Sequence, residues 1–185
     1  MAEVIPFRGL VYRPTAALGQ ESRDASSLLA PPYDVIGEAE RRSLAGQSAF
    51  NSVHLILPQP PVGAEGDARY AVAGATLLAW QRGQVVTRDE QPAFYRYHQV
   101  FSPPGEPSAA KVVRRGFIAR IRLHRFAEGV ILPHERTLSG PKVDRLKLKR
   151  ATRTHLSQVF GLYDDPERNA DAAFAAIEQS APELH

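Results

Sequence analysis

The chain has 185 residues, enough for one domain with its own core, and its 43% hydrophobic and 23% charged residues exclude a wholly disordered or fibrous molecule. It has no cysteine, which excludes disulfides, thiolate catalysis and cysteine-based metal sites. The formal net charge is only +3, and no apolar run is long enough to span a membrane. The first residues lack the basic and apolar regions of a signal peptide, so we expect a cytoplasmic protein with no membrane partner.

In the first half of the chain, apolar periodicity and turn residues predict short strands and helices. Residues 28–36 contain the pair Pro31-Pro32, whose fixed φ angles predict a stiff, extended connector. Residues 65–82 have the clearest helical pattern, with Trp80 as a core residue on its apolar face. The other predicted elements are strands at residues 4–12, a loop at 15–27, a short helix at 38–44 and a strand at 52–57.

The second half predicts a hairpin, a further strand and two helices. Residues 93–101 and 112–123 have strand-like alternation, and the Pro- and Gly-rich residues between them supply the loop of an antiparallel hairpin. Residues 158–163 predict another strand, and Asp165-Pro166 predicts a helix with an aspartate cap and proline in its first position. Because helices and strands are mixed throughout, we expect an α+β fold, with a mainly antiparallel sheet and packed helices.

The small net charge conceals a strong asymmetry along the chain. Residues 111–153 contain thirteen Lys and Arg against three acids, a local charge of +10, whereas the rest of the chain carries −7. This asymmetry predicts a small anionic or phosphorylated partner for the basic segment. A solvated basic face, or one that docks onto the chain's own acidic surface, would give the same pattern.

The densest group of chemically active side chains lies in residues 133–142, Pro-His-Glu-Arg-Thr-Leu-Ser-Gly-Pro-Lys. The Gly140-Pro141 pair predicts a helix that begins there, with free backbone N–H groups and a positive dipole end facing the turn at residues 137–140. Such a turn can hold a phosphate group. The alternative is an ordinary loop in which Thr137 or Ser139 caps the helix.

The predicted helix also carries a row of cations. Lys142, Arg145, Lys149 and Arg153 fall within an arc of roughly 80° at 100° per residue. Like charges so close repel one another, but they become favourable when an anion lies nearby. The candidate phosphate- or substrate-binding residues are therefore Arg136, Thr137, Ser139, Gly140, Lys142 and Arg145.

Three residues are candidates for catalytic proton transfer. His134 and Glu135 can act as a pair, or Glu135 alone can act as a general base for a hydroxyl nucleophile. Asp34 follows the proline connector, where a carboxylate loses little entropy on acting as a base or binding an ammonium group. An Asx turn or a helix N-cap is the alternative role of Asp34. The six histidines include no pair at the helical i, i+4 spacing, so no metal site is predicted.

Several of these segments resemble one protein family. The segments, in chain order, are Ile5-Pro6-Phe7-Arg8-Gly9-Leu10, Ala30-Pro31-Pro32-Tyr33-Asp34-Val35-Ile36, Arg115-Gly116-Phe117-Ile118-Ala119-Arg120, Leu132-Pro133-His134-Glu135-Arg136-Thr137-Leu138-Ser139-Gly140-Pro141-Lys142 and Gly161-Leu162-Tyr163-Asp164-Asp165. They resemble the DUF1015 family of bacterial and archaeal proteins, which are mostly uncharacterised. We therefore expect a DUF1015-like region at residues 1–165 and a C-terminal helix at 166–185 packed on the same domain.

The resemblance also bears on completeness and on wider kinship. Typical members of the family are longer and carry an Asp-Gly-His-His-Arg segment further downstream, so the resemblance implies that this chain corresponds to the N-terminal half. Some members are labelled as similar to the ParB group. The resemblance extends to free serine kinases of the ParB and sulfiredoxin type.

Two functions follow as expectations. The first is part of a kinase for a small hydroxy amino acid such as serine, with Glu135 or Asp34 as the base and Arg136 and Lys142 offsetting phosphate charge. A nucleotide or pyrophosphate with a divalent cation would be its cofactor. The second is a ParB-like regulatory module that binds a nucleotide or nucleic acid through the basic helix. Because no helix-turn-helix pair stands out, nucleic acid is the less favoured partner.

Overall fold

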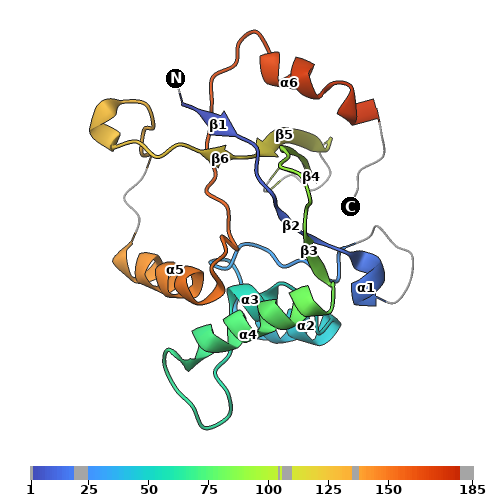
Figure 1. Ribbon diagram of the computed structural model, residues 1–185, viewed down its shortest axis with the longest axis vertical. Helices are drawn as coiled ribbons and strands as arrows, with labels where there is room; N and C mark the ends of the chain where they lie inside the picture. Colours follow the sequence, from blue (N-terminus) through green and yellow to red (C-terminus); the bar gives the residue numbers. More distant parts are fainter. Residues whose placement is uncertain (1, 19–24, 104, 106–109, 135–137, 180–185) are drawn as a thin grey trace. The chain divides into compact units, whose positions relative to one another are not determined.

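The computed structural model describes residues 2–18, 25–103, 105, 110–134 and 138–179 of the chain. Helices and short antiparallel strand pairs are mixed in it, which confirms the predicted α+β fold (Figure 1). The chain divides into two compact units, which we describe in turn. The first unit comprises Met1–Gly9, Arg88–Glu135 and Asp165–Ile177, and the second comprises Leu10–Thr87, Arg136–Asp164 and Glu178–His185.

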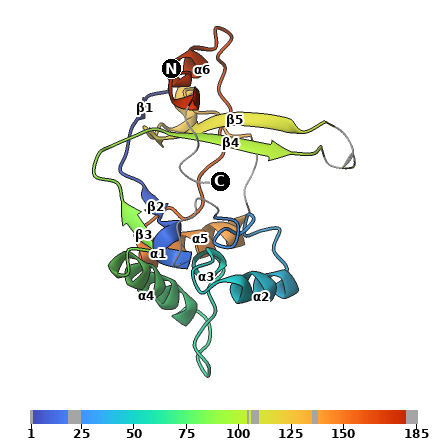
Figure 2. The ribbon, with the colours of Figure 1, turned by 90° about the vertical axis from the view of Figure 1, so that its right-hand side faces the viewer.

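The first unit is built on two antiparallel strand pairs. One pair is β1 (Val4–Ile5) with β6 (Arg120–Ile121), and the other is the hairpin of β4 (Tyr95–Phe101) and β5 (Val112–Ile118), the long ribbon in Figure 2. The hairpin confirms the sequence prediction, but its second strand ends at Ile118 because Arg120–Ile121 pairs with β1 instead. The short helices η1 (Phe126–Glu128) and α6 (Asn169–Phe174) also belong to this unit, whereas η2 (Ile177–Gln179) lies at the boundary between the two units in the chain.

Aromatic rings and one ion pair fasten α6 to the hairpin. The ring of Phe117 lies 6.2 Å from that of Phe94 and 5.6 Å from that of Phe174. The side chain of Arg96 is only 7% exposed and binds Asp171 at 2.7 Å. Its guanidinium also lies 5.1 Å from the centroid of the Phe174 ring. A charge this well covered needs its carboxylate partner, so the pair fixes the helix in place.

The start of α6 differs in detail from the prediction. The carboxylate of Asp165 accepts hydrogen bonds from the backbone N–H groups of Asn169 and Ala170, both at 2.9 Å. This confirms that Asp165 satisfies free amides at the helix start. The helix nevertheless begins at Asn169, so the expected first helical position of Pro166 is wrong.

The second unit contains most of the helices. Strand β2 pairs with β3, and four of the helices follow one another along the chain before the return of α5. The elements are β2 (Leu10–Tyr12), α1 (Pro14–Leu18), α2 (Glu38–Gln47), α3 (Val53–Ile56), α4 (Ala68–Arg82), β3 (Val86–Arg88) and α5 (Ser139–Thr152).

The apolar face of α4 forms the centre of this unit. Tyr70, Ala73, Leu77 and Trp80 are all buried, which confirms the helical pattern and the core role of Trp80. The Trp80 ring lies 6.0 Å from the ring of Tyr12. Burial of Tyr12 raises the pKa of its hydroxyl. The helix ends at Arg82, as predicted.

Three expectations for local structure are wrong. The strand predicted at residues 52–57 is wrong, because Val53–Ile56 form the helix α3. The buried Asn51 accepts a hydrogen bond from the N–H of Val53 at 2.9 Å and starts this helical turn. Residues 15–18 of the loop predicted at 15–27 belong to the helix α1. Residues 158–163 form no strand; Val159 and Leu162 are 91% and 90% exposed there.

Two predicted helix ends also shift. Helix α2 continues through Gly46 to Gln47, and α4 begins at Ala68 instead of residue 65.

Nothing in the described part of the chain is a helix both long and apolar enough to cross a bilayer.

Candidate functional site

The helix α5 begins inside the motif at residues 133–142. Its first residue is Ser139, and Leu138 precedes it in an extended conformation with φ −65° and ψ 145°. Among the residues that the structure describes, no side chain caps this end, and its first turn contains no acid. The N–H of Lys142 reaches the carbonyl of Leu138 at 3.4 Å. Because Pro141 has no N–H, Ser139 and Gly140 supply the helix-start amides that an anion can use.

In the first turn of α5, Ser139, Gly140 and Lys142 are all exposed. A Cβ atom built on Gly140 would meet no described atom within 4 Å apart from its chain neighbours and the helix's own backbone. The ammonium of Lys142 has no ion-pair partner among the residues that the structure describes. Backbone amides, the positive helix end and an exposed lysine therefore lie within the first turn of one helix, an arrangement that suits a phosphate or carboxylate group.

Three of the predicted site residues, Glu135, Arg136 and Thr137, lie outside the described residues. His134 is described and exposed, and it belongs to the first unit. The proton-transfer and phosphate-binding roles of these four residues stay predictions.

Asp34 lies in the second unit, in an exposed turn that follows the proline connector. The N–H of Val35 bonds to the carbonyl of Pro32 at 3.1 Å, which closes this turn. The residue before α2 is Gly37, so Asp34 is not its N-cap. The structure leaves the carboxylate in water, and its role as a base stays a prediction.

The row of cations on α5 is exposed in part. Lys142, Lys149 and Arg153 are exposed, as a binding surface requires, and Arg150 lies on the same side of the helix. Leu146, Lys149, Arg150 and Arg153 line a shallow hollow of about 390 Å³. We call Lys142, Lys149, Arg150 and Arg153 the basic face of α5. The predicted row of cations does not contain Arg150. Its position, four residues after Leu146 and three before Arg153, places it on the same side of the helix and could have shown this.

Arg145 has different surroundings from the other predicted cations. Its guanidinium donates to the carbonyl of Ile56 at 2.9 Å, pairs with Asp144 and lies 4.0 Å from the centroid of the Tyr33 ring. The contact with Tyr33 holds the proline connector against α5. A phosphate role for Arg145 stays a prediction, and its observed contacts position the helix.

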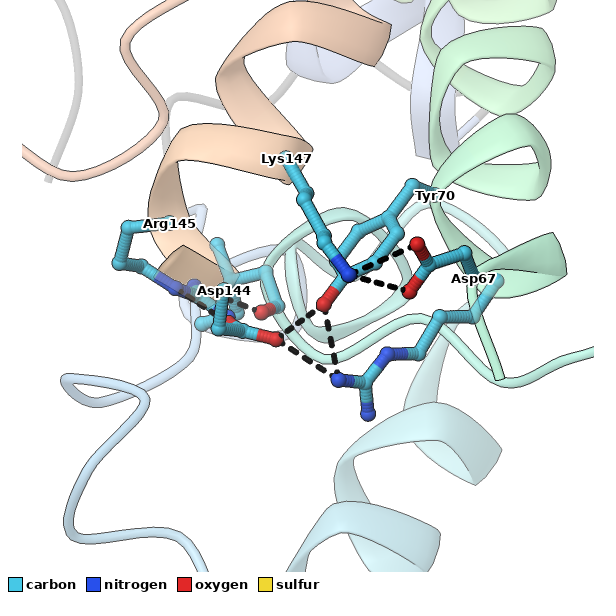
Figure 3. A network of polar contacts seen from close by, with 7 residues as sticks. Asp67, Tyr70, Asp144, Arg145 and Lys147 are labelled. Atoms are coloured by element: carbon cyan, nitrogen blue, oxygen red, sulfur yellow. Dashed lines mark hydrogen bonds and ion pairs between the residues drawn. The ribbon is translucent and has the colours of Figure 1, made fainter. Parts of the chain in front are cut away.

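The carboxylate of Asp144 is the centre of a polar network between α4 and α5 (Figure 3). Its Oδ1 accepts hydrogen bonds from the hydroxyl of Tyr70 at 2.7 Å and from Arg69 at 2.8 Å, while Arg145 binds Oδ2. Burial opposes ionisation of Asp144, but the hydrogen bonds from Tyr70 and Arg145 outweigh it and lower the pKa of the carboxyl. The charged form of Asp144 therefore ties the two helices together.

A second ion pair uses another cation of α5. Lys147 donates to both carboxylate oxygens of Asp67 at 2.9 and 2.7 Å, beside the network in Figure 3. This hydrogen bonding raises the pKa of the Lys147 ammonium. The cations of α5 thus fall into two groups, with Arg145 and Lys147 facing protein carboxylates and the basic face directed to solvent.

No three His, Asp or Glu side chains come close enough to hold a metal ion in the ranges that the structure describes.

Comparison with known proteins identifies the family. The model of a family described as "Protein of unknown function (DUF1015)" matches residues 4–185, and the chain therefore belongs to this family. No curated protein and no solved structure matches the chain. The DUF1015 resemblance is confirmed, whereas kinship with the ParB group or with sulfiredoxin-type kinases stays a prediction.

Proposed function

We propose that this DUF1015 protein binds the phosphate group of a small molecule at the start of α5, as part of a kinase for a hydroxy amino acid such as serine. The observation that carries the proposal is a helix start with no acid in its first turn, an exposed lysine beside it and no capping side chain among the described residues. Helix starts strongly favour a Ser, Thr, Asp or Asn side chain that satisfies these amides. No described side chain does so here, and we propose that a ligand takes this place.

Phosphoryl transfer needs this kind of arrangement more than it needs covalent chemistry. Its transition state spreads negative charge over the oxygens of the transferred group, so positioning and positive charge supply most of the rate enhancement. The amides of Ser139 and Gly140 with the ammonium of Lys142 would supply both. The rest of the basic face of α5 raises the local positive potential, which attracts an anionic ligand.

The remaining roles rest on the sequence motif. Glu135 is the proposed base that takes the proton from the acceptor hydroxyl, with Asp34 or His134 as the other candidates. Arg136 and Thr137 complete the proposed phosphate cradle. The donor would be a nucleotide or pyrophosphate with its divalent cation, since a phosphorylated donor brings the group that is transferred.

Substitution of Gly140 tests the phosphate site without damage to the helix. Gly140→Asp places a carboxylate in the open space of the first turn, where it favours the helix dipole but repels an anion. Gly140→Ala is the matched control, because it adds a Cβ without charge at the same place. Titration with pyrophosphate, followed by calorimetry and by ³¹P NMR, should show binding to the original chain and to Gly140→Ala, weakened about tenfold or more in Gly140→Asp.

Equal affinity of the two Gly140 variants for pyrophosphate would contradict the proposed site. The kinase activity is tested separately, in a longer member of the family, by formation of phosphoserine from serine and a phosphate donor. Glu135→Gln should abolish this turnover with folding unchanged. Unchanged turnover would remove Glu135 from the role of base.

A ParB-like module that binds a nucleotide or nucleic acid is the second candidate. It is supported by the basic face of α5, whose four cations have no ion-pair partner in the described part of the chain. Binding of an oligonucleotide through these side chains should weaken steeply with salt, with a slope near −0.7 to −0.9 for each phosphate contacted. Absence of binding at low salt would exclude this function.

A further inference from the structure

A cavity of about 240 Å³ lies in the second unit, and its lining shares no residue with the basic face of α5. It is somewhat smaller than the roughly 300–1,000 Å³ of pockets that hold drug-sized ligands, so a fitting occupant has only a few heavy atoms. The lining combines apolar and polar side chains from α2, α3, α4 and the segments between them. It consists of Arg41, Ala49, His54, Leu57, Gln59, Val72 and Thr76.

The charge beside this cavity is positive. Glu38 binds Arg41 at 3.0 Å and lies 3.8 Å from Arg42, so one carboxylate stands between two guanidinium groups. The Arg41 side chain is 15% exposed and lines the cavity, whereas that of Arg42 is 71% exposed and does not. Arg41 uses Nε and Nη2 for Glu38, which leaves Nη1 available. The lining contains no acid, so an anionic group can approach Arg41.

Three polar groups of the lining lack protein partners. The Nε2 atom of His54 lies 3.1 Å from the carbonyl of Ser48. A carbonyl only accepts, so Nε2 carries the proton and Nδ1 of the neutral imidazole is an acceptor. Within the described residues, Nδ1 of His54, the amide of Gln59 and the hydroxyl of Thr76 make no hydrogen bond to protein. Together these groups can accept hydrogen bonds from a ligand as well as donate hydrogen bonds to it.

We propose that this cavity binds a small carboxylic acid that also carries a hydroxyl or amino group. The carboxylate would accept a hydrogen bond from Nη1 of Arg41, the guanidinium nitrogen that Glu38 leaves unused. The hydroxyl or amino group would donate to Nδ1 of His54 or to the oxygens of Gln59 and Thr76. The apolar Leu57 and Val72 would contact the carbon skeleton, so each chemical part of such a ligand meets a matching part of the lining.

The probes for the test are L-lactate and L-alanine, with acetate as the control acid that lacks the second polar group. Each is titrated into the full chain, with calorimetry for affinity and NMR of the His54 imidazole for location. L-lactate or L-alanine should bind saturably and shift the His54 resonances, and acetate should bind about three- to tenfold more weakly because it leaves the hydrogen-bonding groups unmatched. No saturable shift at His54 with either probe, or equal affinity for acetate, would overturn the proposal.

Matched variants separate the cavity from its surroundings. Thr76→Val replaces a hydroxyl that makes no protein hydrogen bond with a methyl group of similar size, so the fold should persist while probe affinity falls about three- to tenfold. Arg41→Gln should lower affinity at least tenfold, whereas Arg42→Gln, outside the lining, should leave it within about twofold. Unchanged affinity in Thr76→Val, or equal losses in the two arginine variants, would contradict the assignment. Pyrophosphate binding at α5 is scored by Gly140→Asp, so the two sites succeed or fail independently.

Discussion

Helix α4 approaches α5 closely at Gly74, and a single methyl group there tests the packing that positions the basic face. A Cβ atom built on Gly74 would lie 2.8 Å from the carbonyl oxygen of Ala151 and 3.4 Å from its carbonyl carbon. The obstacle is backbone, which cannot turn aside as a flexible side chain can, so Gly74→Ala forces the two helices apart. Overpacking of this kind costs about 1–3 kcal/mol.

The substitution also has a favourable component. Alanine is a better helix former than glycine by up to about 1 kcal/mol, so the net loss of unfolding free energy in Gly74→Ala should be about 1–2 kcal/mol. Gly46 of α2 is the matched control, because a Cβ atom there would meet nothing within 4 Å. Gly46→Ala should therefore raise the unfolding free energy, by up to about 1 kcal/mol.

Urea denaturation followed by circular dichroism measures both variants, with the slope against denaturant checked for constancy. The two glycine-to-alanine changes should move the midpoint in opposite directions. A Gly74→Ala chain as stable as the original, or stabilised in parallel with Gly46→Ala, would refute the close approach of α4 and α5. Gly74→Ala should also weaken pyrophosphate binding if the packing of α5 positions its start.

Two further substitutions probe α5. Asp144→Asn removes a carboxylate that Tyr70 and Arg69 contact, and it should lower the unfolding free energy at neutral pH by about 1–3 kcal/mol. The folded-state pKa of Asp144 is lowered, so its carboxylate stabilises the fold above the usual carboxyl pKa near 4, and this stabilisation is lost as the pH falls through the folded-state pKa. The unfolding free energy of Asp144→Asn should therefore decline less steeply in acid than that of the original chain. An unchanged acid profile would contradict this role. Arg153→Gly should raise the unfolding free energy by about 1 kcal/mol in denaturant melts, because Arg153 has a left-handed φ of 55° that glycine adopts freely. The same substitution should lower the affinity for pyrophosphate. A lower unfolding free energy would contradict the first expectation, and unchanged affinity would contradict the second.

The sequence predicts elements well where the pattern is local. The apolar face of α4 repeats at helical spacing from Tyr70 to Trp80, and it is buried as that spacing requires. The strand predicted at residues 52–57 is wrong because the conformation of this segment depends on a partner that is distant in the sequence. The side chain of Asn51 donates to the carbonyls of Ser27 and Leu29, and this contact cannot be read from the apolar pattern.

The candidate site divides in the same way. Spacing alone predicts that Lys142, Lys149 and Arg153 share an exposed side, and the structure agrees. Spacing cannot show that Arg145 turns toward Tyr33 and Ile56, because those residues come from segments about 90 to 110 positions earlier in the chain. Long-range partners therefore decide which of the predicted cations remain exposed.

The charge distribution of α5 explains how one short helix carries so many cations. Asp144 neutralises Arg145 and also binds Arg69 of α4, while Asp67 at the start of α4 binds Lys147. The pairs with Arg69 and Asp67 fasten α5 to α4. The basic face then lies in water, where the repulsion between like charges is screened and costs little. An anion bound near Lys142 would gain from the same charges without breaking either ion pair, because the side chains that hold α5 in place differ from those that face solvent. Mutations on this helix should therefore change stability and anion binding separately, which is why Arg153→Gly is expected to raise the unfolding free energy while it lowers the affinity for pyrophosphate.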